Sequence, residues 1–279
     1  ITEINTIRKH LSEIKGGQLA KSIYPANAIS LILSDVVGDP LEVIASGPTV
    51  ADNSTYKDAY AIMKRFKLHE QFPVTVTKRL LLGKIGIIPD TTKDTHPCFQ
   101  STRNCILGSN KTALNTAADV AMRKGFKTII VADNLQDDYL KVADFILNKI
   151  DENSFNKKKK HPVCLLFGGE PTVPVRGEGL GGRNQHIALY LATKIQNKPN
   201  VTILCAGTDG TDGPTNAAGA VVDNKTVGKA LNSGFNAYQY LQEFDSYHFF
   251  NQYGGHIITG STQTNVMDII VIIMNQNEL

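Results

Sequence analysis

Two glycine-rich segments hold the residues best suited to chemistry in this chain. The first, FGGEPTVPVRGEGLGGRNQ, begins at Phe167, and the second, GTDGTDGPTNAAGAVVD, ends at Asp223. Glycine at this density lets the backbone approach a ligand and turn its N–H groups toward phosphate oxygens, and the carboxylates between the glycines can hold a metal or take a proton. These residue types predict a phosphoryl-transfer site.

The glycines of the first segment admit three interpretations. Residues 177–182 satisfy G-x-G-x-x-G ahead of a predicted helix, which is the pattern of a dinucleotide-binding turn. Pro174 disturbs the strand that this turn requires, and the next acid, Asp209, lies too far along the chain to bind a ribose. The glycines are better explained as an anion cradle at a helix N-terminus, and a purely structural turn is the alternative.

Arg183 follows three glycines in the preceding four residues and falls in the first turn of the predicted helix. A guanidinium at this point can reach the phosphate held by the glycine loop and stabilise charge on a transferring phosphoryl group. Most arginines are surface residues, but this position predicts a catalytic role for Arg183.

Asp209 and Asp212 lie three residues apart, directly after the predicted core strand VTILCAG. Two such carboxylates can bind Mg²⁺ with water and phosphate completing the shell, or one can accept a hydroxyl proton. The alternative is a pair of Asx-turns that only shape the loop. Since ligands of α/β sheets bind at the carboxyl ends of strands, we predict that both residues bind metal and that Asp209 is catalytic.

Further candidates follow other predicted strands. Glu170 and Thr172 come after Gly168 and Gly169, and could contact a ribose, a substrate hydroxyl or the metal, or only cap the turn. His186 is interpreted as an ordinary helix residue, because none of the histidines has metal-ligand spacing. The full predicted nucleotide-binding set is Gly168, Gly169, Glu170, Thr172, Gly179, Gly181, Gly182, Asn184, Ser34, Asp35 and Asp39.

Predicted strands alternate with predicted helices, which favours an α/β fold with a parallel or mixed sheet covered on both faces. The segments 104–108, 109–122 and 127–133 are predicted to form a βαβ unit. Residues 83–97 lose periodicity and are interpreted as a linker, so we expect one domain over 1–97 and another over 98–279. The other expected strands are 28–36, 163–169, 201–207 and 268–274, and the other expected helices are 3–21, 55–66, 138–150, 184–195, 226–232 and 236–244.

Composition narrows the class of protein. The 279 residues are 42% hydrophobic and 20% charged, with a net charge of +3 that is too small to indicate a nucleic-acid surface. No apolar run approaches the roughly 18 residues that a membrane span needs. The four cysteines lack C-x-x-C spacing, which favours reduced thiols and the cytoplasm. The chain opens on a helical pattern without a Met, as if an upstream portion had been removed.

Several ordered motifs together resemble class II glycerate kinase, and the C-terminal portion is similar to its MOFRL domain. The resemblance spans nearly the whole chain, which makes it more specific than any single loop. The motifs are RKHLS at 8–12 with KGG at 15–17, SDVVGD at 34–39, ASGPT at 45–49, GGEPT at 168–172, GGRNQ at 181–185 and GTDGTDG at 207–213.

This resemblance implies ATP-dependent phosphorylation of D-glycerate to 2-phosphoglycerate, with Mg²⁺. It implies a cleft between an N-terminal Rossmann-like lobe and a C-terminal α/β lobe with a mixed sheet. Arg183 matches the family's functional arginine, whereas a functional lysine near the family's N-terminus has no counterpart here, so we expect a truncated first lobe.

The resemblance and the composition also bear on competing functions and on partners. The alternative to a kinase is a non-catalytic fragment that binds a nucleotide or another anion, and an NAD-dependent oxidoreductase rests on the glycine pattern alone. The expected partner is a small molecule, neither nucleic acid nor membrane, with a homo-oligomer left open. The expected compartment is the cytoplasm, with the mitochondrion as the alternative.

Overall fold

The computed structural model describes residues 1–154 and 161–275 and divides the chain into two compact units. The first unit comprises residues 1–32 and 38–107, and the second comprises 33–37 together with the chain from 108 onward. The domain boundary expected after residue 97 therefore falls inside the first unit.

The first unit is mainly helical. Its elements are α1 (Thr2–Leu11), α2 (Gln18–Ile23), α3 (Tyr56–Arg65), α4 (Val74–Lys84), the short 3-10 helices η1 (Ile44–Ser46), η2 (Leu68–Glu70) and η3 (Pro97–Ser101), and most of β1 (Ala28–Leu33) and β2 (Thr102–Gly108). Its core is formed by Ile7, Tyr56, Ala59, Met63 and Leu80, which come from α1, α3 and α4. The sequence predicted α3 well, because Thr55 and Asp58 form a capping box at its start.

The single helix expected over 3–21 is wrong, because the structure has two helices there. Gly16 and Gly17 adopt φ of 61° and 76°, in the left-handed region that glycine enters without steric cost. Their N–H groups donate to the carbonyls of Ser46 and Gly47 instead of continuing the helix. α1 itself ends at Leu11, where Ser12 is extended, and the long-range bonds of Gly16 and Gly17 directly precede α2.

The second unit is built on a mixed sheet of strand order β3-β4-β8-β5-β6-β7. β3 and β4 are parallel, and every other neighbouring pair is antiparallel. The strands are β3 (Lys127–Leu135), β4 (Val163–Gly169), β5 (Val201–Gly207), β6 (Gly219–Asp223), β7 (His256–Ile257) and β8 (Asp268–Met274). The expected βαβ unit is wrong, because β2 pairs with β1 in a separate two-stranded sheet.

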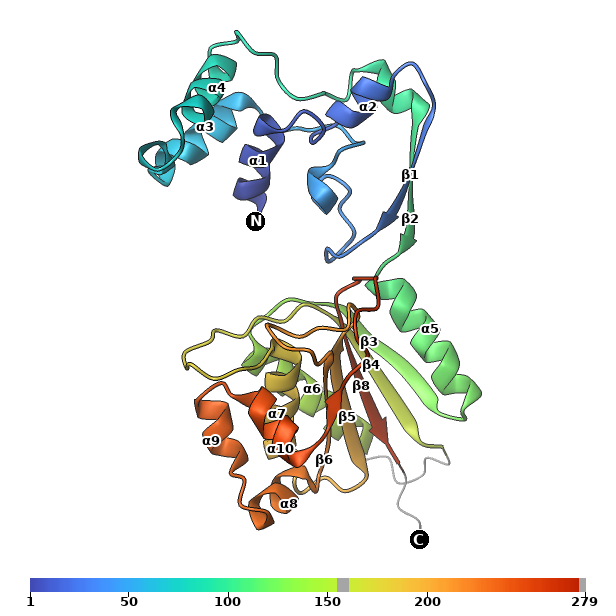
Figure 1. Cartoon of the computed structure of the whole chain (residues 1–279). Coiled ribbons are helices and arrows are strands. Elements are labelled where there is room, and N and C mark those ends of the chain that lie inside the picture. The colour runs from blue at the N-terminus through green and yellow to red at the C-terminus, as the bar shows by residue number, and fades with distance from the viewer. Residues whose placement is uncertain (155–160, 276–279) are drawn as a thin grey trace. The chain divides into compact units, whose positions relative to one another are not determined.

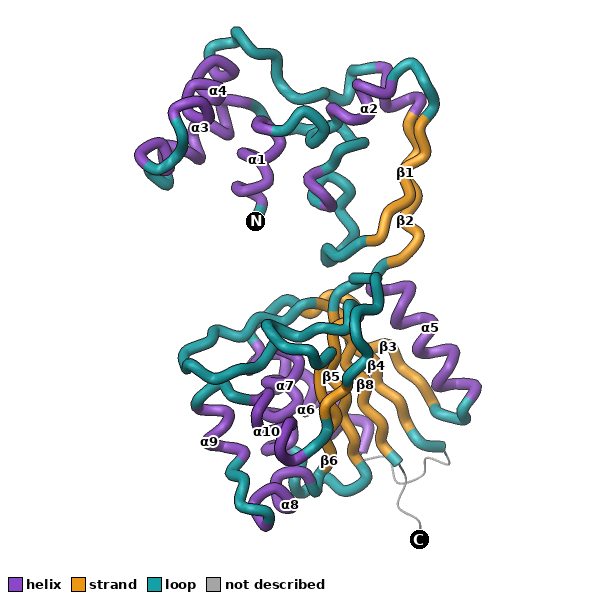
Figure 2. The backbone as a smooth tube through the Cα atoms, in the orientation of Figure 1, coloured by secondary structure: helices purple, strands orange, loops and turns teal. Residues whose placement is uncertain are grey.

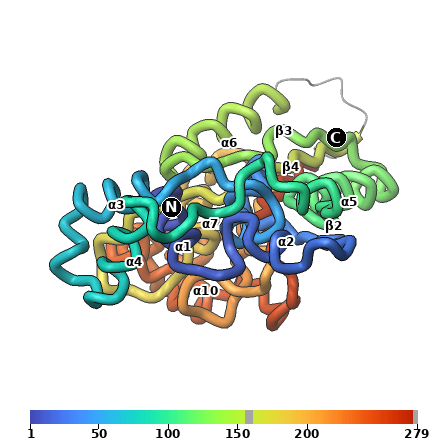
Figure 3. Tube along the Cα trace, turned by 90° about the horizontal axis from the view of Figure 1, so that it is seen from above, coloured from blue at the N-terminus to red at the C-terminus, as the bar shows by residue number. Residues whose placement is uncertain are grey.

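Helices cover the two faces of this sheet unequally (Figures 1 and 2). The helices are α5 (Asn110–Arg123), α6 (Tyr139–Ser154), α7 (Arg183–Lys194), α8 (Thr226–Asn232), α9 (Ala237–Gln242) and α10 (Ser246–Tyr253). α5 and α6 lie on opposite sides of β3 and β4 (Figure 3), and β4 is buried along its whole length. β5 alternates between buried and half-buried residues, so its second face is less covered than the sequence analysis expected.

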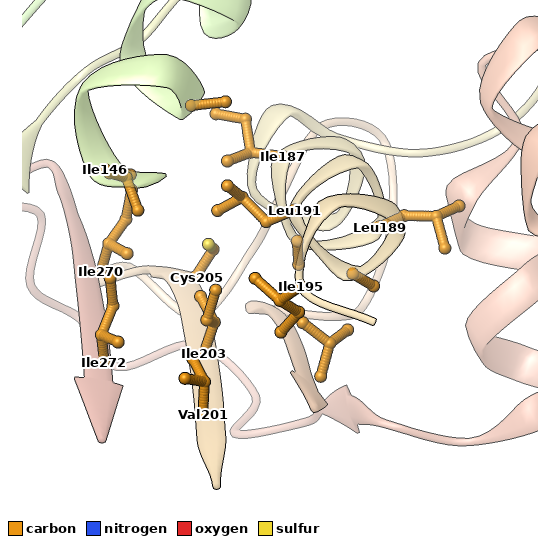
Figure 4. Packing of buried hydrophobic residues seen from close by; sticks show 14 of the residues in the cluster. Ile146, Ile187, Leu189, Leu191, Ile195, Val201, Ile203, Cys205, Ile270 and Ile272 are labelled. Atoms are coloured by element: carbon orange, nitrogen blue, oxygen red, sulfur yellow. The ribbon is translucent and has the colours of Figure 1, made fainter. Parts of the chain in front are cut away.

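The larger core fills the space between the sheet and the helices α6 and α7 (Figure 4). Ile187 and Leu191 of α7 and the following Ile195 recur at helical spacing and pack toward the strands, whereas Leu189 points away from them. Val201, Ile203 and Cys205 of β5, with Ile270 and Ile272 of β8, face this helix at the alternate positions expected of strands. This packing fixes α7 against β5, and therefore fixes the first residue of α7, Arg183, beside the ends of the strands.

The mixed α/β class is confirmed. In the described part of the chain, the first unit contributes only β1 and β2 as strands, so its Rossmann-like character stays a prediction. Among the described residues, no helix has the length and apolarity needed to cross a membrane.

Candidate active site

The candidate site lies at the edge of the sheet where β4 and β5 end and β8 begins. Asp268, the first residue of β8, is paired with Gly169 at the end of β4 and with Gly207 at the end of β5. Glu170 follows β4 directly, and Asp209 follows β5 after one intervening residue. Three carboxylates therefore come from three neighbouring strands to one edge, beside the N-terminus of α7.

Arg183 is held between two of these carboxylates. Its Nε and Nη2 donate to the two oxygens of Asp268, at 2.5 and 3.1 Å, and its Nη1 lies 2.7 Å from Glu170 Oε1. The side chain of Asp268 is only 3% exposed, whereas that of Glu170 is 46% exposed. Although burial lowers the pKa of the Arg183 guanidinium, the bonds to Asp268 and Glu170 outweigh it and hold the pKa above its ordinary value. Arg183 is thus a fixed cation with a defined orientation.

Asp212 holds the N-terminus of α7. Its two oxygens accept from the backbone N–H groups of Asn184 and Gln185, both at 2.9 Å, and from the side-chain amides of the same residues. Burial raises the pKa of Asp212, and these hydrogen bonds oppose the rise. The amides at this helix start, which the sequence analysis assigned to a bound anion, therefore already bind an anionic group of the chain itself.

The glycine pattern at 177–182 is explained by close packing against the corner between α9 and α10. Gly179 N–H donates to Glu243 O at 3.0 Å, and the N–H of Leu180 donates to Asp245 Oδ1 at 2.9 Å. A Cβ at Gly177 would overlap Glu243, and one at Gly179 would overlap both Glu243 and Asp245. The pattern also does not follow a strand directly, so the dinucleotide-binding interpretation is not favoured.

Three successive N–H groups remain available at the end of this loop. In the described part of the chain, the backbone N–H groups of Gly181, Gly182 and Arg183 donate to no acceptor. Successive free N–H groups beside a guanidinium form an anion-binding arrangement. An anion cradle at this loop stays a prediction, and the N–H groups available for it lie slightly earlier in the chain than those of Asn184 and Gln185.

Gly181, Gly182 and Arg183 line a cavity of about 620 Å³. Arg183 and Asp209 both contribute to its wall, so the guanidinium and the carboxylate that the sequence analysis paired do share one cavity. The residues that line it are Pro171, Thr172, Val173, Val175, Gly179, Gly181, Gly182, Arg183, His186, Asp209, Thr211, Asp212, Gly213, Pro214, Phe244 and Ser246.

Several residues of the predicted set stand outside this lining. Gly168 and Gly169 are needed for packing, because a Cβ would overlap Asn110 at the first position and the backbone of Leu135 at the second. Glu170 does not line the cavity itself but forms an ion pair with Arg183, which does. Asn184 is buried and bonds to Asp212. Nucleotide binding by these four residues stays a prediction.

The candidates at 34–39 do not line the cavity. Ser34 is fully buried, and its hydroxyl bonds only to the backbone of Val36. Asp35 is exposed, and Asp39 belongs to the first unit. Their assignment to nucleotide binding stays a prediction.

A metal could be held here only with help from a ligand. Among the described residues, no group of three or more His, Cys, Asp or Glu side chains could hold a metal ion. Asp209 Oδ1 accepts from the Thr211 N–H at 3.0 Å, and Oδ2 accepts no hydrogen bond within the described chain. Asp209 therefore fits Mg²⁺ that also binds phosphate oxygens, which is how Mg²⁺ is usually held. The bonds that Asp212 makes to α7 count against the predicted pairing of Asp212 with Asp209, which stays untested.

Asp268 was not among the predicted site residues, and neither were several residues of the cavity wall, among them His186, Phe244 and Ser246. An acid that opens an otherwise apolar strand, as in DIIVIIM, was the available signal for Asp268. No local signal exists for the others, because α7 and the α9–α10 corner meet only in the folded chain.

The fold and the site define an α/β protein with a cavity at a strand edge whose wall includes Arg183 and Asp209. Residues 163–268 match the model of the MOFRL family, and residues 1–81 match a domain of unknown function, DUF4147. The chain is 39% identical to the D-glycerate 2-kinase of Thermotoga maritima, over 97% of this chain and 62% of that protein. It is 37% identical to the glycerate kinase of Macaca fascicularis, over 96% of this chain and 77% of that protein.

Two solved structures share the fold. The glycerate kinase of Thermotoga maritima superposes with a TM-score of 0.86 at 38% identity, covering 98% of this chain and 63% of that one. A protein of Pyrococcus horikoshii gives 0.82 at 40% identity, covering 99% and 63%. The chain belongs to the glycerate kinase family that carries the MOFRL region. It spans 62% of the length of the Thermotoga maritima relative.

Proposed function

We propose that this protein transfers the γ-phosphoryl group of ATP to the 2-hydroxyl of D-glycerate, giving 2-phosphoglycerate. The observation that carries the proposal is the shared cavity of Arg183, Asp209 and the free N–H groups at 181–183, in a chain whose relatives include a D-glycerate 2-kinase. The relatives do not favour the alternative of a non-catalytic anion-binding fragment.

Each group of the cavity has its own role in phosphoryl transfer. The N–H groups of Gly181, Gly182 and Arg183 bind phosphate oxygens, and the Arg183 guanidinium stabilises charge on the phosphoryl group as it moves. Asp268 and Glu170 hold that guanidinium in one orientation, so little reorganisation is needed during the reaction. Asp209 ligates the metal or orients the attacking hydroxyl.

The charge of the site supports a requirement for Mg²⁺. Glu170, Asp209 and Asp268 set three carboxylates against the single guanidinium of Arg183. An ATP tetra-anion would be repelled by that surplus, and Mg²⁺ held by Asp209 would cancel part of the repulsion by neutralising charge on the phosphates. Mg²⁺ supplies neutralisation of the phosphate oxygens when it is bound.

We infer further features of the protein's organisation. The two units correspond to two domains, and the substrate is a small molecule. The four cysteines are all free thiols, which supports the cytoplasm as the compartment. Assembly into a homo-oligomer stays open.

The test is a coupled assay of ADP release by the full-length protein with ATP, Mg²⁺ and D-glycerate, with L-glycerate as the matched control. ³¹P NMR of the product then locates the phosphate. The proposal expects turnover that is selective for D-glycerate, and 2-phosphoglycerate as product. ATP binding without transfer to glycerate would instead support the non-catalytic fragment.

A further inference from the structure

The backbone of Leu180, in the glycine-rich loop at 177–182, is bound at both of its polar groups. Its N–H donates to Asp245 Oδ1 at 2.9 Å, and its carbonyl accepts from the N–H of Tyr247 at 2.9 Å. In the described part of the chain, the bond to Asp245 is the one hydrogen bond of this loop that a side chain makes. A substitution at Asp245 can therefore release the loop without changing the loop sequence.

Asp245 occupies the N-cap position of α10, where an aspartate usually accepts from the first N–H groups of its own helix. Here its side chain makes no such capping bond. The N–H of Tyr247, the second residue of α10, donates to the carbonyl of Leu180 instead. The carboxylate of Asp245 therefore binds the glycine loop, and not the helix that it precedes.

A second donor binds the same carboxylate oxygen. His248 Nδ1, in the first turn of α10, lies 2.6 Å from Asp245 Oδ1. A carboxylate oxygen has two lone pairs, so it can accept from His248 and from the Leu180 N–H together. The side chain of Asp245 is 22% exposed, so its removal leaves no sealed cavity in the core.

The residues that follow Leu180 carry the free N–H groups. In the described chain, the N–H groups at 181–183 donate to no acceptor, and the next one along, that of Asn184, donates to Asp212. The free N–H groups thus lie between two carboxylates that bind the chain, Asp245 before them and Asp212 after them. Two of the three residues are glycines, whose backbone is otherwise free to adopt many conformations. The two carboxylates restrict that freedom.

We propose that Asp245 is a positioning residue for the phosphates of the nucleotide, because its bond to Leu180 orders the N–H groups at 181–183 before the ligand binds. The inference rests on the proposed function and extends it to a residue outside the cavity lining. Donors that are ordered in advance bind an anion more tightly, since less conformational entropy is lost on binding.

The charge of Asp245 acts in the opposite direction. A carboxylate near the phosphates repels them, so a purely electrostatic effect predicts tighter phosphate binding when the charge is removed. Positioning predicts weaker binding when the hydrogen-bond acceptor is removed. Asp245→Ala removes both the charge and the acceptor, whereas Asp245→Asn removes the charge and keeps an oxygen that accepts from the Leu180 N–H.

The experiment measures binding and kinetics in these two variants of the full-length protein. Calorimetry gives Kd for ATP and for inorganic tripolyphosphate, each with Mg²⁺, and steady-state kinetics gives KM for D-glycerate at saturating ATP. Asp245→Ala should raise both Kd values about tenfold, the loss of one hydrogen bond. Asp245→Asn should stay within about threefold of the wild type, because a neutral acceptor bonds more weakly than a carboxylate.

The KM for D-glycerate distinguishes positioning of the phosphates from a general structural role. It should change less than about twofold in both variants, since the N–H groups at 181–183 are assigned to the nucleotide. Asp119→Ala replaces an exposed aspartate of α5 and is the matched control, which should change none of the three values.

Three results would overturn the inference and leave the proposed function standing. In the first, Asp245→Ala binds both probes as tightly as the wild type, or more tightly, as the charge alone predicts. In the second, Asp245→Asn binds them as weakly as Asp245→Ala, so the acceptor is not what matters. In the third, the KM for D-glycerate rises by the same factor as the Kd values. A wild-type protein that binds neither probe and does not phosphorylate glycerate would overturn the proposed function itself, and the inference with it.

Discussion

Arg183 donates to two carboxylates of its own chain, so a substitution of Arg183 changes the stability of the protein as well as its chemistry. Asp268 is almost fully buried, so it would be left as an unpaired buried charge if Arg183 were removed. Breaking such a pair typically costs about 3–5 kcal/mol, whereas the half-exposed Glu170 contributes little. A simple Arg183→Ala variant therefore confounds lost chemistry with lost stability.

His186 should make the stability of the protein depend on pH. Burial lowers the pKa of His186 to about 4 from the ordinary 6.5, so the unfolded state binds more protons between these values. Stability from this residue is complete above pH 6.5 and is lost as the pH falls toward 4, by up to about 3 kcal/mol. Urea denaturation at pH 7, 5.5 and 4 should show a shallower loss for His186→Phe than for the wild type. Equal losses in both proteins would contradict this expectation.

At the scale of elements, the loop before α7 is shaped by contacts that only glycine permits. A Cβ at Gly182 would overlap Asp212, the residue that caps α7, and one at Gly181 would overlap Ser246. The density of glycine in this segment is therefore required by packing at several positions.

Gly182→Ala should destabilise the protein by about 2–4 kcal/mol, because the new methyl group displaces Asp212 from the start of α7. Gly228→Ala is the matched control: it lies inside α8, and a Cβ there meets nothing within 4 Å. Alanine at 228 should raise the free energy of unfolding by about 0.5–1 kcal/mol, since glycine is unfavourable inside a helix. Urea denaturation measures both, and a neutral Gly182→Ala variant would show that the loop can shift.

Local sequence patterns predicted the bounds of helices and strands better than they predicted which strands pair with each other. β4, β5 and β8 begin and end where their apolar runs do, and Thr55 marked the start of α3. The helix over 3–21 was wrong because Gly16 and Gly17 bond to a distant turn. The βαβ unit was wrong because β2 pairs with β1. Long-range packing determines this pairing, and the periodicity of the local sequence contains no information about it.

At the scale of the whole molecule, the same limit explains which parts of the site were predictable. Arg183 was expected at the site because it follows the glycine loop at the start of a helix, and Asp209 because it follows a core strand; both line one cavity. Asp268 was missed because it begins its strand, and it reaches this edge only because β8 runs antiparallel to β4 and β5. The spacing of Asp212 suggested a metal ligand, whereas its contacts to Asn184 and Gln185 span 28 and 27 residues.

ATP with Mg²⁺ should stabilise the folded protein. A ligand at 100 times its Kd adds about 2.7 kcal/mol, which thermal denaturation detects as a higher Tm. ATP with EDTA should raise the Tm much less. The carboxylates of the site outnumber its guanidinium, so they repel the phosphates of metal-free ATP and weaken its binding. An equal shift with and without the metal would contradict the proposed role of Mg²⁺.

The central claim is that Arg183 acts on the transferring phosphoryl group, and kcat measured in a pair of variants tests it most directly. Asp268→Asn keeps Arg183 but removes the buried charge, so adding Arg183→Ala to it leaves no unpaired buried carboxylate. With matching Tm values, the double variant should show a kcat for ATP and D-glycerate about 10²- to 10³-fold below that of Asp268→Asn alone. Equal kcat values in the two variants would contradict the account.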